Sequence, residues 1–231
     1  SGVDLPLTPN AWVTSDQPDF VAVIGNAGET LVYSSYYGWS GQDAPGDVEF
    51  DPLGRLVLTG GGTSADYPVT AGVLQPELSG LGDGQLTCID LSDGSIVFAT
   101  FFGGGANDAP SELSVDASGL ITVAGVTDSL NFPITPGAFQ ITKTPFTREG
   151  FVARISPEAD RLLYSSFLGG SAQDVMSGMD LHVGANGSAT IVGDTKSLDF
   201  PVTPGAFDPT QNGSADAFIV RMSLLPQGVV K

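Results

Sequence analysis

Three aspartates that recur at nearly constant spacing are the main candidates for chemistry in this sequence. Asp43, Asp108 and Asp174 stand 65 and 66 residues apart, and each follows an aromatic and glycine-rich stretch. As turn residues they would accept hydrogen bonds from nearby backbone N–H groups. As hard oxygen ligands, with loop carbonyls and water, they would hold Ca²⁺ ions. We expect the turn role, because no second acid accompanies all three.

The other side chains with chemical potential occur singly. One histidine, His182, cannot build a multi-histidine zinc site, and one cysteine, Cys88, cannot form an intrachain disulfide. Trp39 lies in a Gly/Ser-rich turn beside Asp43, where it would either stack on a sugar ring or pack as a partly buried aromatic. No spacing identifies a carboxylate pair for glycoside hydrolysis. We therefore expect no catalytic residues and no cofactor, with Ca²⁺ as the alternative.

The composition is that of an acidic globular chain. Eight Lys and Arg residues stand against 26 Asp and Glu residues, which gives a formal net charge of −18. Such a charge repels phosphate backbones and anionic lipid surfaces, so we expect neither nucleic-acid binding nor membrane insertion. The few histidines and cations also disfavour a hydrolase or lyase, since those sites need a strong base or an oxyanion-stabilising cation.

A proline-rich decapeptide recurs along the chain. Its prolines fix φ and disfavour helix in the residues before them, so each copy is expected to be a stiff extended connector. We expect it to act as a strut at the rim of the fold, with trans Pro133 and Pro201 and with Phe139 and Phe207 buried as anchors. A binding loop is the alternative. The copies are DLPLTPNAW (4–12), DYPVTAGVLQ (66–75), NFPITPGAFQ (131–140) and DFPVTPGAFD (199–208).

Between the decapeptides lie short stretches of alternating apolar residues, which predict β-strands. Pairs of these stretches are joined by DPLG, DASG and GANG, whose residues suit the positive φ of tight hairpin turns. Each complete unit has four such stretches, and the chain contains them in groups of two, four, four and three. We interpret residues 1–231 as one repeat domain with units at about 1–65, 66–130, 131–198 and 199–231, the last of them partial.

Four-stranded antiparallel units repeated at this period are the signature of an all-β, β-propeller-like fold. A β-solenoid is the rival interpretation, but its coils are shorter and its strands parallel. Three to three and a half blades are fewer than the four to eight that propellers use, so we expect an open arc or part of a larger propeller. An open arc leaves strand edges exposed. We therefore expect a protein partner, or the remainder of a longer precursor, to cover them.

The motifs D-F-P-x-T-P-G-A-F, D-A-F-V-x-[KR]-[LI] and L-x-Y-S-[ST]-[FY]-L-G-G together resemble the bacterial beta-propeller repeat family, SBBP repeats. The resemblance covers nearly the whole chain and weakens in the second copy, where AGVLQ replaces PGAFQ. It implies a propeller-like fold in exported bacterial proteins, which would be periplasmic, cell-surface or extracellular, and it brings no catalytic residue set. We expect a non-catalytic structural or interaction module. The alternative is a carbohydrate- or Ca²⁺-dependent ligand-binding propeller, with a glycan as the possible partner.

Overall fold

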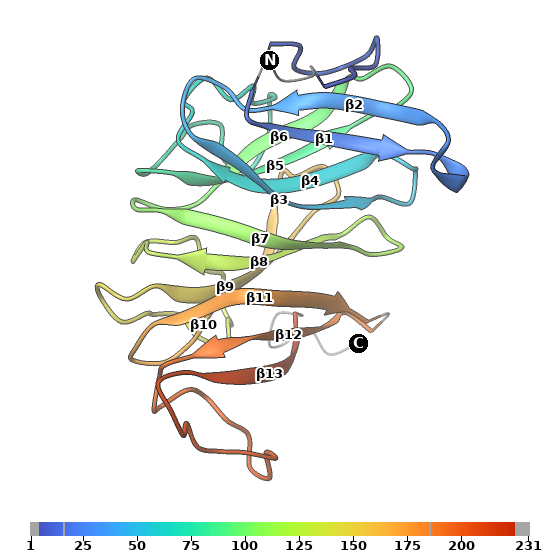
Figure 1. Ribbon diagram of the computed structural model, residues 1–231. Helices are drawn as coiled ribbons and strands as arrows, with labels where there is room; N and C mark the ends of the chain where they lie inside the picture. The colour runs from blue at the N-terminus through green and yellow to red at the C-terminus, as the bar shows by residue number, and fades with distance from the viewer. Residues whose placement is uncertain (1–4, 16, 185, 225–231) are drawn as a thin grey trace.

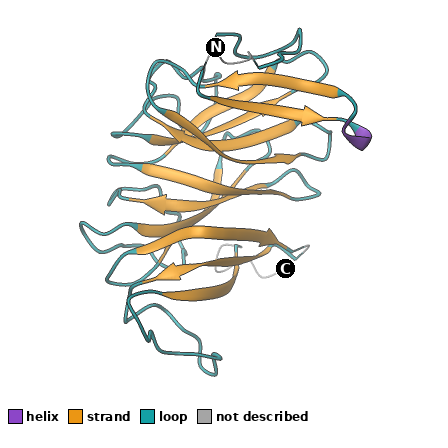
Figure 2. Cartoon of the chain, viewed as in Figure 1, coloured by secondary structure: helices purple, strands orange, loops and turns teal. Residues whose placement is uncertain are grey.

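The computed structural model describes residues 5–15, 17–184 and 186–224, which form an all-β protein (Figures 1 and 2). Within these described residues, the regular elements are thirteen strands and one short 3₁₀ turn, η1 (Asn26–Gly28). The described part of the chain contains no helix of the length and apolarity needed to cross a bilayer. The strands are β1 (Asp19–Ile24), β2 (Leu31–Tyr37), β3 (Asp43–Phe50), β4 (Leu56–Gly62), β5 (Asp83–Ile89), β6 (Ile96–Phe102), β7 (Asp108–Val115), β8 (Ile121–Thr127), β9 (Glu149–Ile155), β10 (Leu162–Leu168), β11 (Asp174–Val183), β12 (Ser188–Thr195) and β13 (Asp216–Ser223).

The strands form four antiparallel sheets in which chain neighbours pair. The first sheet is β1-β2, the second β3-β4-β5-β6, the third β7-β8-β9-β10 and the fourth β11-β12-β13. This confirms the predicted grouping of two, four, four and three strands. Tight turns connect the first two strands of each of the last three sheets. They contain Gly54, Gly119 and Gly187 at φ of 77°, 78° and 75°, a region that glycine enters without steric cost.

The sheets follow one another in chain order from the first, blue, to the fourth, orange and red (Figure 1). Strand β7 lies against β3 and β4 of the second sheet, and β11 lies against β7, β8 and β9 of the third. Aromatic rings fill the space between sheets: Phe132 packs on Phe151 at 4.4 Å and on Phe102 at 5.0 Å between ring centroids. The first and fourth sheets lie at opposite ends, so the described residues form no closed ring.

Four proline segments correspond to the repeated decapeptides: residues 5–13, 66–75, 131–140 and 199–208. The first three run along the outer edges of β2, β6 and β10. In the third, the Thr135 N–H donates to the Ser165 carbonyl at 3.2 Å, and the Ser165 N–H donates to Thr135 Oγ1 at 2.9 Å. Each of these three segments thus occupies an edge that another strand would otherwise pair with. The peptide bonds at Pro133 and Pro201 are trans, as expected.

The expectation that Phe139 and Phe207 are buried anchors is wrong. Their side chains are 59% and 107% exposed, whereas the aromatic residue before the first proline is buried, with Tyr67 at 2% and Phe132 at 3%. Burial at the later position depends on the following sheet. Leu74 holds the position of Phe139 in the second proline segment. Its N–H donates to the Ala159 carbonyl in the β9–β10 turn of the following sheet at 2.8 Å. For Phe139 the equivalent place in the following sheet lies outside the described residues.

The corrected anchor leads to a stability prediction. Truncating buried Phe132 to Ala should lower the free energy of unfolding by about 3–5 kcal/mol, because it removes an aromatic ring from the interface between the second and third sheets. The matched change Phe139→Ala, in the same proline segment, should cost far less. Denaturant unfolding of both variants checks this, and an equal loss for the two would contradict the assignment of Phe132 as the anchor.

Candidate functional site

The loops that connect successive sheets are closed by the three recurring aspartates. Each carboxylate accepts a hydrogen bond from the backbone N–H four residues earlier, which fixes the loop. This confirms their predicted turn role. The bonds are Trp39 N to Asp43 Oδ2 at 2.9 Å, Gly104 N to Asp108 Oδ2 at 2.6 Å and Gly170 N to Asp174 Oδ2 at 2.6 Å.

Hydroxyl groups at the end of the second strand of the same sheet, and just beyond it, also donate hydrogen bonds to these carboxylates. Asp108 accepts hydrogen bonds from Thr127 Oγ1 and from Ser129 Oγ, at 2.5 and 2.8 Å, and is 2% exposed. Burial raises the pKa of Asp108, and these hydrogen bonds oppose that shift. Within the described residues, no three His, Cys, Asp or Glu side chains are grouped as a metal site. The carboxylate oxygens therefore accept hydrogen bonds from groups of the protein, and Ca²⁺ binding stays the alternative prediction.

Asp43, the first of the three aspartates, accepts a hydrogen bond from a different donor in place of the threonine hydroxyl. Gly62 stands where the other copies have threonine, and a Cβ atom there would lie 1.9 Å from Asp43 Oδ1. The space is taken by the Gln85 side chain, whose Nε2 donates to Asp43 Oδ1 at 2.9 Å. Gln85 Oε1 in turn accepts the Tyr37 hydroxyl hydrogen at 2.6 Å. The turn cap is thus preserved although one hydroxyl donor is missing.

The last residue of a proline segment binds a second carboxylate. Gln140 Nε2 donates to Glu149 Oε1 and to the Thr142 carbonyl, the latter at 3.0 Å, while its Oε1 accepts the Gly169 N–H at 3.1 Å. Burial raises the pKa of Glu149 to about 7, and the hydrogen bond from Gln140 acts in the opposite direction. The sequence reasoning missed this contact, although the glutamine that ends two of the decapeptides is its visible signal.

The first residue of a proline segment caps the loop before it. Asp199 Oδ1 accepts hydrogen bonds from the Ser171 N–H at 2.8 Å and from Ser171 Oγ at 2.9 Å, which lower the pKa of Asp199. Asp66 makes the same pair of contacts with Ser40. The second segment is tied at both ends to the loops between sheets, at its start through Asp66 and at its end through Gln75, whose Oε1 accepts the Gly103 N–H at 2.9 Å.

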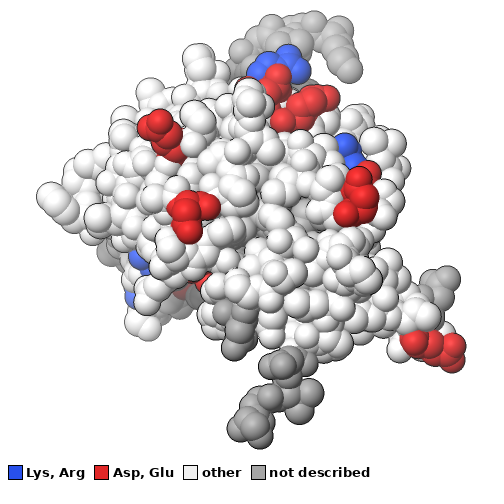
Figure 3. All heavy atoms as spheres, turned by 90° about the horizontal axis from the view of Figure 1, so that it is seen from above, with Lys and Arg blue, Asp and Glu red and all other residues white. Residues whose placement is uncertain are grey.

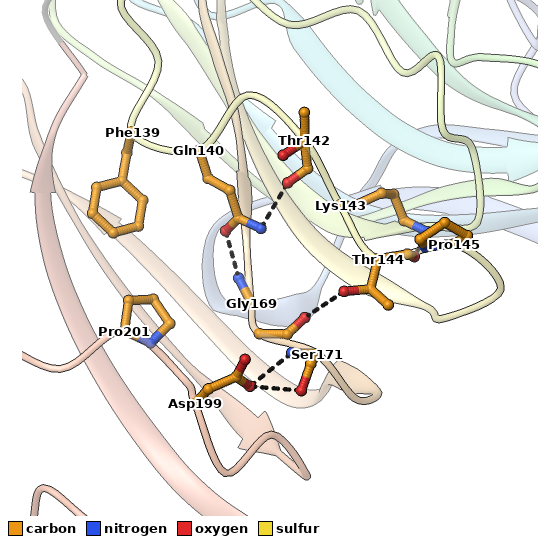
Figure 4. A pocket seen from close by; sticks show the side chains of 11 residues that line it. Phe139, Gln140, Thr142, Lys143, Thr144, Pro145, Gly169, Ser171, Asp199 and Pro201 are labelled. Atoms are coloured by element: carbon orange, nitrogen blue, oxygen red, sulfur yellow. Dashed lines mark hydrogen bonds between the residues drawn. The ribbon is translucent and has the colours of Figure 1, made fainter.

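A cavity of about 520 Å³ opens where these loops meet at the junction of the third and fourth sheets (Figure 4). The exposed ring of Phe139 points toward Pro201 on one side of it. Thr144 and Lys143 line the other side, and the Lys143 ammonium donates to the carbonyls of Thr144 and Thr147. The cavity is thus apolar on one wall and hydrogen-bonded on the other, and it is the candidate binding site.

The remaining side chains singled out in the sequence lie apart from this cavity. The Trp39 ring packs edge-on against Trp12, Tyr37 and Tyr67, which gives it a packing role, and its stacking on a sugar remains a prediction. His182 is exposed on β11 opposite Thr190. Cys88 is fully buried, and burial raises the pKa of its thiol to about 12. The structure therefore does not join these three into one site.

A second group of acids, not identified from the sequence, lies on the first strands of the last three sheets. Asp47, Glu112 and Asp180 occupy equivalent places on β3, β7 and β11, because the residues that follow them pair with Leu58, Val123 and Ile191. Burial, followed by the charges of Asp47 and Asp180, raises the pKa of Glu112 to about 7. Alignment of the repeats could have revealed the shared acid, but its proximity to the others depends on how the sheets stack.

The raised pKa of Glu112 predicts a pH-dependent stability. Because the folded-state pKa lies above the unfolded value, the contribution of Glu112 is full at pH values below about 4.5 and is lost as the pH rises through about 7. Glu112→Gln should therefore raise the melting temperature at pH 8 and have little effect at pH 5. The exposed control Glu158→Gln removes the same charge. Equal shifts for both variants at both pH values would refute the prediction.

No protein-family model matches this chain, and no curated protein matches it either. The likeness to SBBP repeats therefore remains a resemblance carried by the motifs in the sequence.

Proposed function

We propose that this protein is a non-catalytic structural or interaction module, built as a propeller-like arc, that pairs with a strand of a protein partner. The observation that carries the proposal is the outer edge of β13. In the second and third sheets the equivalent strands, β5 and β9, pair on that side with β6 and β10. Over the described residues, β13 pairs only with β12.

The surroundings of β13 support the same proposal. Ile219 in the middle of the strand is 78% exposed, and the fourth proline segment carries Phe207 at 107% exposed. In the first three sheets such a segment covers the outer edge of the last strand, as Thr135 does on β10. Between β13 and the fourth segment, the described residues hold no strand of this kind. A backbone edge with apolar neighbours is a template for strand addition.

The internal copies indicate the sequence that such a partner strand would carry. The last strands read LVYSSYY, IVFATFF and LLYSSFL, with aromatic residues separated by small or hydroxyl residues. The hydroxyls bond to the proline segment: Ser166 Oγ accepts the Gln140 N–H at 2.9 Å, and Ser35 Oγ accepts the Val13 N–H at 2.7 Å. A partner strand of this pattern pairs with β13 on one side and with residues 199–208 on the other. The remainder of a longer precursor would supply the same chemistry.

The charge distribution and the resemblance support the rest of the proposal. Seen from the first-sheet end, acidic groups are scattered over the surface rather than gathered in one patch, and basic groups are fewer (Figure 3). A scattered charge of one sign favours solubility and disfavours acidic partners. An exported, cell-surface or extracellular bacterial location belongs to the same proposal, and its support is the likeness to SBBP repeats.

Strand addition can be tested with a peptide of the protein's own sequence. A labelled peptide with the sequence of residues 162–170, LLYSSFLGG, made soluble by a lysine tail, should bind the chain saturably in fluorescence anisotropy. A matched peptide with proline in place of the residues corresponding to Ser165 and Phe167 should not bind, because proline donates no backbone hydrogen bond. Equal binding of both peptides, or no binding of either, would contradict the proposed function.

A further inference from the structure

We infer that Asn212 is a site of spontaneous covalent modification, at which the Gly213 backbone nitrogen converts the asparagine to isoaspartate and aspartate. The sequence contains two Asn-Gly pairs, and both continue as Asn-Gly-Ser, at residues 186–188 and 212–214. Glycine suits the reaction because it has no Cβ atom to hinder attack by its nitrogen. The structure distinguishes the two pairs, and the inference is independent of the proposed function.

The reaction needs only the chain and water. After the Gly213 nitrogen loses its proton to solvent hydroxide, it attacks Cγ of Asn212 and forms a new N–Cγ bond. The Cγ–Nδ2 bond then breaks, and Nδ2 takes a proton from water and leaves as ammonia, which gives a cyclic succinimide. Water opens the succinimide at either carbonyl, so the products are isoaspartate and aspartate. In sum, one water is consumed and one ammonia is released, with no oxidation or reduction.

The loop around Asn212 leaves the attacking nitrogen accessible. Residues 212–215 are exposed, and the loop that carries them from β12 to β13 extends away from the sheets (Figure 1). Over the described part of the chain, the Gly213 N–H makes no hydrogen bond. The Asn212 amide makes exposed contacts, of which the shortest run from Nδ2 to the Thr210 carbonyl at 2.8 Å and to Asp208 Oδ2 at 3.1 Å. Exposed hydrogen bonds of a loop open at low cost, so Cγ can turn toward the nitrogen.

The corresponding nitrogen is protected at Asn186. The Gly187 N–H donates to the Gly184 carbonyl at 2.8 Å in the tight turn between β11 and β12. Asn186 Oδ1 accepts hydrogen bonds from the Ser188 N–H at 3.2 Å and from Ser188 Oγ at 2.7 Å, which fix the side chain in the turn. Attack therefore requires the turn to open and to lose these bonds. With the same three residues at both places, the folded protein favours reaction at Asn212.

Two carboxylates near Asn212 oppose the reaction, because negative charge disfavours the deprotonated nitrogen. Asp208 accepts a hydrogen bond from Asn212 Nδ2, and Asp216 accepts one from the Asn212 N–H. In an exposed loop, water and salt screen this repulsion. The accessibility of the Gly213 nitrogen therefore has the larger effect.

The products weaken the loop that precedes β13. In the aspartate product, a carboxylate oxygen replaces Nδ2 opposite Asp208 and the Thr210 carbonyl, so two hydrogen bonds become repulsive contacts. Isoaspartate instead lengthens the main chain by one methylene group, beside the Asn212 N–H that donates to Asp216. Asp216 is the first residue of β13. Modification of Asn212 thus acts on the start of this strand.

Peptide mapping by mass spectrometry, on the full chain kept at mildly alkaline pH, measures both asparagines in one sample. Asn212 should convert about tenfold faster than Asn186, because a hydrogen-bonded turn protects the latter. In denaturant, where neither Asn-Gly-Ser sequence is folded, the two rates should converge. Equal rates in the folded chain, faster conversion of Asn186, or no conversion of Asn212 while the denatured chain reacts would overturn the inference.

Gly213→Ala tests the identity of the attacking atom. A Cβ atom at Gly213 would lie 3.7 Å from Asp216 Oδ1 and 3.8 Å from the Ala215 carbonyl oxygen, which are ordinary contacts, so the variant should fold normally. Its methyl group should slow the conversion of Asn212 and leave that of Asn186 unchanged. Conversion of Asn212 at the unaltered rate would refute attack by the nitrogen of residue 213.

Two aspartate variants test the consequence for the loop. Asn212→Asp should lower the melting temperature, because it removes two donors and adds a charge beside Asp208. The matched change Asn186→Asp should have little effect, since its carboxylate can still accept both hydrogen bonds from Ser188. Equal melting temperatures for the two variants would contradict the effect on the loop before β13.

Discussion

The junctions between sheets depend on the hydrogen bonds that a buried aspartate accepts at the start of the first strand of a sheet. Asp108 holds the backbone of the incoming loop through Gly104 and the end of the neighbouring strand through Thr127. Hydrogen bonds to a charged acceptor are roughly twice as strong as neutral ones, and a buried donor left without its acceptor is costly. One side chain thereby fixes the position of the loop, which then sets where the next proline segment begins.

The proline segments give each of the first three sheets an end that no further strand can extend. Their prolines lack the N–H groups that a continuing ladder needs, while their threonines and terminal glutamines bond to the strand and the loops that they cover. The first three sheets have this edge protection, and within the described residues the fourth sheet does not. At β13 the described residues contain the proline segment without a strand of the kind that such a segment covers in the first three sheets.

The repeats share a backbone fold but place different side chains between the sheets. Gln85 and the Tyr37 hydroxyl form a hydrogen bond where the third and fourth sheets have Phe151 and Phe218. Trp39 likewise stands where the later loops have Gly104 and Gly170. Since the hydrogen bonds that shape the loops are unchanged, such substitutions alter the surface between sheets and leave the fold in place. Variation among the repeats therefore changes the contacts between sheets while the loops keep their shape.

The sequence alone determined the strands, their grouping and the capping role of Asp43, Asp108 and Asp174, because alternation, turn glycines and local hydrogen bonds act over a few residues. It did not determine which aromatic ring of a proline segment is buried. Phe132 and Phe139 stand in the same decapeptide, but only the first meets a neighbouring sheet within the described residues. The raised pKa of Glu112 also required the stacked sheets, which bring Asp47 and Asp180 to it from distant parts of the chain. Burial and electrostatic coupling arise from neighbours distant in sequence, and only the tertiary structure decided them.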